Sequence, residues 1–266
     1  MRVYADNAAT TKLSAAAKEA MLPYFDEIYG NPSTLYTLGQ EAAEHLLACR
    51  TEIAQLIGAA DPREIVFTSG GSEADNQAIV SAAENGARKG KKHLISTKFE
   101  HHAVLHTLDK LRRQGFEVTL LDVHEDGVVR VEDVAAAIRD DTALVSVMFA
   151  NNEIGTLQPI EAIGALCRER GVPFHTDAVQ AIGHVQAQKV DMLSLSAHKF
   201  HGPKGIGVLY ARKGIVLTSL IEGGAQERGK RGGTENTPAI AGMTAALREA
   251  IDHMDENMRN VTCLRE

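Results

Sequence analysis

The sequence predicts an α/β protein in which a mostly parallel, seven-strand-type sheet is flanked by helices. Short apolar runs alternate with amphipathic stretches of 10 to 15 residues between about residue 64 and residue 212, which is the pattern of a parallel sheet covered on both faces. The 266 residues are 44% hydrophobic and 24% charged, an ordinary globular composition with ample length for a core.

Seven short runs rich in branched apolar residues have the length and bounding residues of buried strands. The predicted strands cover residues 64–69, 93–97, 117–123, 143–150, 172–178, 190–197 and 205–212.

Helices are predicted before, between and after these strands. The first begins near Ser14, which can cap it, and the second runs from about Gly39 to Ile57 and ends at Gly58. The helices between strands are predicted at residues 72–87, 101–115, 131–140 and 160–171.

The last segment predicts one long amphipathic helix, because apolar residues recur every three to four positions from Ile240 to Val261. Neither a glycine cap nor a proline stop follows it. We therefore expect residues 1–15 to be a segment of a small domain, residues 16–240 to be the large domain, and residues 241–266 to begin a helix that leads to an absent C-terminal domain. The alternative is a helix that frays at a natural terminus.

Charge and cysteine content exclude several classes of protein. The net charge of −7 gives no indication of a basic face that would bind nucleic acid or anionic lipid. No apolar stretch approaches the length of a membrane-spanning helix. The start of the chain lacks the apolar core of a signal peptide. Three widely spaced cysteines, Cys49, Cys167 and Cys263, without a CxxC pair, indicate a reducing cytoplasm.

Groups able to do chemistry follow five of the predicted strands. They are "SGGSEADN" after the strand at 64, "KFEHH" after the one at 93, "NNEIG" after the one at 143, "DAVQ" after "PFHT", and "AHKFHG" after "LSLS". Each alone could be a solvated turn. Because open α/β sheets bind ligands at the carboxyl ends of their strands, together they predict one site.

Two of these segments offer complementary binding groups. Gly71 and Ser72 begin a helix after a glycine turn, where backbone N–H groups and the serine hydroxyl can hold a phosphate. The alternative is an ordinary capped helix start that binds no ligand. Asp177 ends an apparently central strand, where a carboxylate needs a cationic partner such as a protonated heterocycle, an arginine or a metal.

Metal sites and nucleotide loops find no support in the sequence. The helical spacing of His102 and His106 lacks the glutamate of a zinc motif, so we expect a solvated or capping pair. "GPKGIG" does not satisfy GxGxxG, and "GAQERGKR" has Arg231 where a nucleotide-triphosphate loop needs Ser or Thr.

Lys199 could bind a phosphate, end a strand as a solvated charge, or bond covalently to a carbonyl group. Its expected neighbours are the phosphate turn, Asp177, Gln180, His101 and Asn152. A phosphate cradle, a carboxylate for a pyridinium nitrogen and a lysine for an aldehyde are together what pyridoxal 5'-phosphate requires. The sequence therefore predicts this cofactor, with Lys199 in the covalent role.

The sequence resembles the cysteine desulfurases, which are class V aminotransferase-like enzymes of fold-type I. The resemblance rests on motifs that come in family order and span nearly the whole chain. They are "YADNAATT", "GNPSTLYTLG", "FTSGGSEADN", "FEHHAV", "ANNEIG", "HTDAVQAIGH", "SLSAHKFHGPKGIG" and "ERGKRGGTENTPAIAG".

The resemblance implies a role for each matching residue. Lys199 would hold the cofactor covalently and shuttle protons, and His101 would stack on the ring and act as an acid or base. The other implied cofactor contacts are Gly71, Ser72, Ser196 and His198 at the phosphate, Asp177 at the ring nitrogen, Gln180 at the phenolic oxygen, Asn152 near the ring and the substrate carboxylate, and Thr234 at the phosphate of a partner subunit. A homodimer with shared sites is therefore expected.

The resemblance also implies a reaction, in which L-cysteine gives L-alanine and its sulfur passes to a protein cysteine as a persulfide. The sulfur would then serve iron–sulfur cluster assembly or tRNA thiolation through an acceptor protein. The family's nucleophilic cysteine and a substrate-binding arginine lie in a C-terminal part that these residues do not match, so we expect a fragment. The alternatives are a selenocysteine lyase or another class V enzyme, and a non-catalytic dimerising scaffold.

Overall fold

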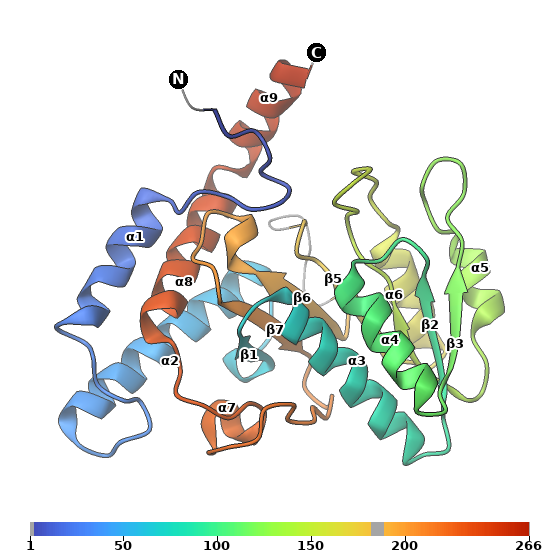
Figure 1. The fold of residues 1–266 in the computed structure, drawn as a ribbon, viewed down its shortest axis with the longest axis horizontal. Helices are drawn as coiled ribbons and strands as arrows, with labels where there is room; N and C mark the ends of the chain where they lie inside the picture. Colours follow the sequence, from blue (N-terminus) through green and yellow to red (C-terminus); the bar gives the residue numbers. More distant parts are fainter. Residues whose placement is uncertain (1–2, 182–188, 266) are drawn as a thin grey trace.

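The computed structural model describes residues 3–181 and 189–265. Residues 182–184, which end the "HTDAVQAIGH" motif, fall outside them, as do the first two residues and the last. Helices pack on both faces of a central sheet, and α8 and α9 rise at one side of the molecule (Figure 1). None of the helices in the described part of the chain is long and apolar enough to cross a membrane.

The sheet has seven strands in the order β1-β7-β6-β5-β4-β2-β3. Their bounds are β1 Ile65–Thr68, β2 His93–Thr97, β3 Glu117–Leu121, β4 Thr142–Ser146, β5 Phe174–Asp177, β6 Met192–Ser196 and β7 Gly207–Ala211. All seven predicted strands are found. Only β7 runs antiparallel to its neighbours, so the other six strands end at the same edge of the sheet.

The predicted helices are also found. Ser14 caps α1 through a bond from the Ala17 backbone, and Gly58, with a left-handed φ of 74°, ends α2. The helices are α1 Ala15–Met21, α2 Thr37–Ile57, α3 Gly71–Ala87, α4 His102–Arg113, α5 Val131–Ala137, α6 Ile160–Glu169, α7 Gln226–Gly229, α8 Thr237–Asp252 and α9 Met254–Arg265, with the 3-10 turn η4 at Ala197–Lys199.

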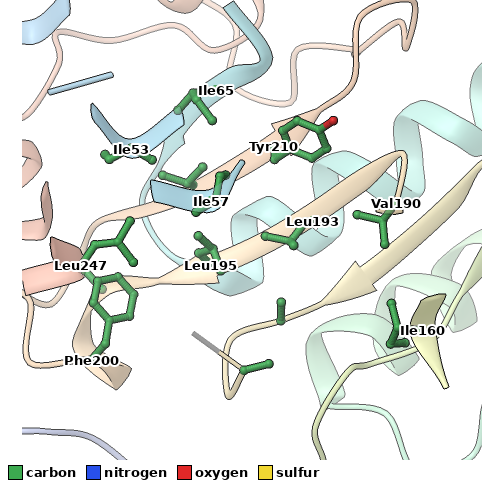
Figure 2. Close-up of a cluster of buried hydrophobic side chains, with 14 of the residues drawn as sticks. Ile53, Ile57, Ile65, Ile160, Val190, Leu193, Leu195, Phe200, Tyr210 and Leu247 are labelled. Atoms are coloured by element: carbon green, nitrogen blue, oxygen red, sulfur yellow. The ribbon is translucent and has the colours of Figure 1, made fainter. Parts of the chain in front are cut away.

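The core has one cluster on each face of the sheet, which explains the apolar runs of the strands. Ile65 and Phe67 of β1 belong to one cluster, while Val66 between them belongs to the other. In Figure 2, Ile53 and Ile57 of α2 lie over Leu195 of the sheet on the first face. Because successive strand residues point to opposite faces, a strand buried on both sides must be apolar throughout.

The C-terminal helix was predicted as one unbroken element, and this prediction was wrong at one residue. His253 has φ −103° and ψ 9°, outside the helical range, and separates α8 from α9. The apolar spacing continues across the break, so the pattern could not reveal it. The helices before and after His253 have different surroundings. Most residues of α8 are buried, whereas no residue of α9 is buried.

A buried ion pair fastens the segment after the sheet to β1. Arg50 of α2 bonds both carboxylate oxygens of Glu227 at 2.7 and 2.6 Å, and Glu227 also accepts a bond from the Phe67 backbone at 3.1 Å. Glu227 and Arg228 adopt left-handed φ angles of 48° and 59°. Such angles are costly for side chains of this size, so the contacts of Glu227 must hold the turn in place.

Replacing Arg50 with alanine is expected to lower the free energy of unfolding by about 3–5 kcal/mol, because it leaves the Glu227 carboxylate buried without the cation that bonds both its oxygens. Urea denaturation measures the change. Arg63→Ala removes an exposed pair with Asp61 and serves as the control, with little expected change in the urea midpoint. Equal midpoints for the two variants would contradict the structural role of Arg50.

Candidate functional site

A cavity of about 470 Å³ opens at the edge of the sheet where the parallel strands end. It lies beside the ends of β5 and β6, the start of α3, the turn η4 and the N-terminal segment. Its walls are formed by Asp6, Ala8, Ala9, Gly71, Ser72, Asp75, His101, Met148, Asn152, Asp177, Val179, Gln180, Ser196, His198 and Lys199.

The structure brings together nine of the ten residues singled out from the sequence. The nine are Gly71, Ser72, His101, Asn152, Asp177, Gln180, Ser196, His198 and Lys199. The tenth, Thr234, is exposed and lines a separate cavity of about 50 Å³ with Arg231 and Asn236. Thr234 therefore does not line the cavity of its own chain, and its role toward a partner subunit stays a prediction.

The start of α3 presents free backbone donors to the cavity. Gly70 precedes the helix with φ 150°, and within the described residues no side chain caps the first turn. A Cβ on Gly71 would lie 2.6 Å from Cγ2 of Val179, so only glycine fits there. Glu73 steadies the turn, because it accepts a bond from the Ser69 backbone and pairs with Arg231 at 3.0 Å. An open helix start of this kind suits a phosphate.

The amine of Lys199 faces the N-terminal segment across the cavity. Its Nζ donates to the carbonyl oxygens of Ala8 and Ala9, and Gln180 also donates to the Ala8 carbonyl, at 2.9 Å. Burial lowers the pKa of Lys199, although Asp177 and Asp6 act to raise it. A lowered pKa increases the fraction of neutral amine, which is the form that attacks an aldehyde.

Asp177 ends β5 with a carboxyl group that is only 5% exposed. Its Oδ1 accepts a bond from the Val179 backbone at 2.9 Å. Burial raises the pKa of Asp177, while that backbone bond and the charge of Lys199 lower it. A carboxylate in this position is stable only beside a cation.

His101 caps α4 and is exposed at the cavity mouth. Its Nδ1 accepts a bond from the Ala103 backbone at 3.1 Å, which leaves Nε2 as the nitrogen that carries a proton. The rings of His102 and His106 stack 5.2 Å apart on the outside of the same helix, where both are exposed, and they do not line the cavity.

Sequence reasoning missed several residues of the cavity wall. Asp6, Ala8 and Ala9 come from the N-terminal segment, which lies against Lys199. The motif "YADNAATT" pointed to that segment, but nothing in it gave a side-chain role. Asp75 lies one helical turn after Ser72, a spacing that could have placed it at the site.

Asp75, His101 and Asp177 place one ligating atom each within 4.8 Å of one another. This spacing would also suit a cation, which the sequence did not predict because the three residues come from separate segments. The other groups that line the cavity favour a ligand larger than a metal ion. A helix start suited to a phosphate, a buried carboxylate suited to a pyridinium nitrogen and a lysine with a lowered pKa, suited to an aldehyde, share one cavity. These residues fit pyridoxal phosphate.

Glu100 lies behind this cluster and joins two strands. Its Oε1 accepts bonds from the Met148 backbone at 2.9 Å and from the Thr97 hydroxyl at 2.7 Å, while its buried Oε2 has no partner among the described residues. Burial raises the pKa of Glu100 to about 8. The sequence gave no signal for it beyond its place beside His101.

The family description "Aminotransferase class-V" matches residues 3–261. Cysteine desulfurase IscS of Clostridium botulinum strain Hall is 50% identical over 268 aligned residues, which cover 99% of this chain and 67% of that protein. Cysteine desulfurase IscS of Methanosarcina thermophila is 50% identical over 99% of this chain and 66% of its own length. The chain thus spans about two thirds of the length of these curated relatives.

Solved structures show the same fold. A structure titled "NIFS-LIKE PROTEIN" superimposes with a TM-score of 0.95 at 41% identity, and covers all of this chain and 74% of its own. A structure titled "SspA in complex with cysteine" gives a TM-score of 0.89 at 40% identity over 97% of this chain and 78% of its own.

Replacing Glu100 with glutamine is expected to flatten the pH dependence of stability. The folded Glu100 holds its proton up to about pH 8 while the unfolded residue loses it at its ordinary pKa, so the wild type loses stability as pH rises across that window. Glutamine keeps both bonds to Oε1 and never ionises, so Glu100→Gln gains a few kcal/mol at alkaline pH relative to wild type.

Urea denaturation at mildly acidic and mildly alkaline pH measures the effect. The matched control is Glu125→Gln, because Glu125 is exposed. If Glu100→Gln and wild type lost stability equally with rising pH, the buried, protonated state of Glu100 would be refuted.

Proposed function

Because the chain belongs to the class V aminotransferase family, and within it to the cysteine desulfurases, we propose that it binds L-cysteine beside pyridoxal phosphate and prepares its sulfur for transfer. In the full reaction, L-cysteine and a protein thiol become L-alanine and a protein persulfide, for iron–sulfur cluster assembly or tRNA thiolation. The observation that carries the proposal is the meeting of Lys199, Asp177 and the open start of α3 in one cavity.

Each wall of the cavity would hold one part of the cofactor. Gly71 and Ser72 would bind the phosphate, helped by Ser196 and His198, and Asp177 would pair with the ring nitrogen. Gln180 would bind the phenolic oxygen, His101 would cover the ring, and Lys199 would hold the aldehyde carbon. When bound, the cofactor draws electrons from the bonds at the amino acid's α-carbon.

The side chains of the cavity then have distinct tasks toward the substrate. Lys199 has a lowered pKa, so its Nζ can take a proton from the substrate and return it. His101 carries its proton on Nε2 and is exposed at the mouth, where it can exchange protons with an entering amino acid. Asn152 offers an amide donor for the substrate carboxylate.

None of the three cysteines in the described residues lines the cavity. Cys167 is buried in α6, where burial raises the pKa of its thiol to about 12, and Cys49 is half-buried in α2 with its pKa also raised by burial. Cys263 is exposed on α9. We propose that the thiol that accepts the sulfur is not one of these three.

The arrangement of subunits and domains is part of the same proposal. Thr234 is exposed next to Arg231, and in a homodimer it would complete the phosphate site of the partner subunit. Residues 16–240 would form the cofactor domain, with residues 1–15 and 241–266 contributing to a smaller one. Three free cysteines suit a cytoplasmic enzyme that hands sulfur to an acceptor protein.

Replacing Lys199 with alanine is expected to abolish the visible absorption band of the protein and the covalent attachment of the cofactor, because Lys199 carries the only amine that lines the cavity among the described residues. Absorbance and borohydride trapping measure the two effects. Lys204→Ala, an exposed lysine in the following turn, is the matched control and should keep both. A colourless wild type that takes up no added cofactor would contradict the proposed function and favour a scaffold.

The 266-residue chain is expected to bind L-cysteine, seen as a change in the cofactor's spectrum, without forming alanine and persulfide at an ordinary enzymatic rate. Replacing Cys49, Cys167 and Cys263 together with serine should leave the spectral change intact. If the unmodified 266-residue chain released alanine at about 1 per second or more, the proposal that none of these three cysteines accepts the sulfur would be refuted.

A further inference from the structure

Asp75 is a buried acid at the cofactor site to which the desulfurase resemblance gives no role. It lies on the inward face of α3, is 1% exposed, and shares the cavity wall with Asp177. Its Oδ1 is buried without a hydrogen-bond partner among the described residues, and the nearest basic nitrogen, Nε2 of His175, lies 3.6 Å away. A buried polar atom left unpaired is costly, so its state needs a physical explanation.

His175 behind Asp75 is held in its neutral form. Its Nδ1 lies 2.9 Å from the Ser146 hydroxyl and its Nε2 lies 2.9 Å from the Ser194 hydroxyl. Burial lowers the pKa of His175 to about 3. Ser194 in turn interacts with the Asp75 carboxyl, so on this side Asp75 meets neutral partners and, within the described part of the chain, no cation.

Asp75 and Asp177 compete for a single negative charge. Both carboxyl groups are buried and their oxygens lie within 4.8 Å, so ionising both would place two like charges in a medium of low dielectric constant. The backbone N–H of Val179 and the charge of Lys199 favour the ionised form of Asp177.

The surroundings of Asp75 act in the opposite direction. Burial and the charges of Asp177 and Glu100 raise the pKa of Asp75 well above its usual value, and only the Ser194 hydroxyl lowers it. Because the surroundings of Asp177 favour its ionised form and those of Asp75 favour its protonated form, the shared proton stays on Asp75.

We propose that Asp75 is a positioning residue for the cofactor's ring nitrogen: Asp75 keeps the proton and leaves Asp177 as the one negative charge that faces that nitrogen. The neutral acid also fills the space between Asp177 and the His175–Ser194 pair with a polar group. This inference rests on the cofactor site and not on the sulfur-transfer step, so it can fail while the proposed function stands.

Nuclear magnetic resonance of the cofactor-loaded chain tests the proposal directly. The protein carries aspartate labelled with ¹³C at the side-chain carboxyl, and pyridoxal phosphate carries ¹⁵N in its ring. At neutral pH we expect one aspartate signal with the shift of a protonated acid, absent from Asp75→Asn and present in the exposed control Asp140→Asn. If the wild-type spectrum contained no signal of a protonated aspartate, the proposal would be overturned. This outcome is read from the wild-type protein alone, so it does not depend on whether a variant folds.

Three further variants test the positioning role. Asn has the shape of a protonated aspartic acid, so Asp75→Asn should keep the ¹⁵N signal of a protonated ring nitrogen and a cofactor Kd within about three-fold of wild type. Asp177→Asn should lose that signal. Asp75→Ala, which removes the polar group, should weaken cofactor binding by about ten-fold.

The opposite results would overturn the inference. An Asp75→Asn variant that loses the ring-nitrogen proton as Asp177→Asn does would show that Asp75 acts through a charge. An Asp75→Ala variant that binds the cofactor as tightly as wild type would show that Asp75 positions nothing. Wild type that takes up no cofactor would overturn the proposed function together with this inference.

Discussion

A buried carboxylate at the end of a central strand is the constraint on which the rest of the site depends. Asp177 is 5% exposed, and a charge withdrawn from water this far costs several kcal/mol unless a cation or hydrogen-bond donors compensate for it. The backbone of Val179 supplies one donor, and Lys199 supplies positive charge nearby. A bound cation would supply the remaining compensation, which is why a protonated heterocycle suits this cavity.

The sheet makes this constraint possible, because it brings the ends of β5 and β6 to one edge. Asp177 pairs in register with Ser194, and two residues beyond Ser194 the strand ends at Ser196 and turns into Lys199. The start of α3 lies against the same edge, since a Cβ on Gly71 would meet Val179. The groups for a phosphate, a ring nitrogen and an aldehyde are therefore fixed relative to one another by backbone hydrogen bonds rather than by flexible side chains.

Segments distant in sequence close the site from outside the sheet. The N-terminal segment lies against Lys199 through the carbonyl groups of Ala8 and Ala9, and Thr11 bonds to the backbone of His198. On the far side, the Arg50–Glu227 pair holds a turn with left-handed backbone angles that leads to Thr234. Such a turn would relax if it were not tied to β1, so the ion pair determines where the loop that carries Thr234 is presented.

The sequence by itself determined the fold class, the seven strands, and nine residues of one cavity, including Lys199 and Asp177. It could do so because strand periodicity places the carboxyl ends at one edge, and because a glycine turn, a buried acid and a lysine carry recognisable chemistry. The resemblance to the cysteine desulfurases added the remaining residues, among them Ser196 and His198. Only the tertiary structure decided the rest. The break at His253, the N-terminal wall and the proximity of Asp75 to Asp177 depend on contacts between segments far apart in the chain, and neither spacing nor composition records the distance between two buried acids.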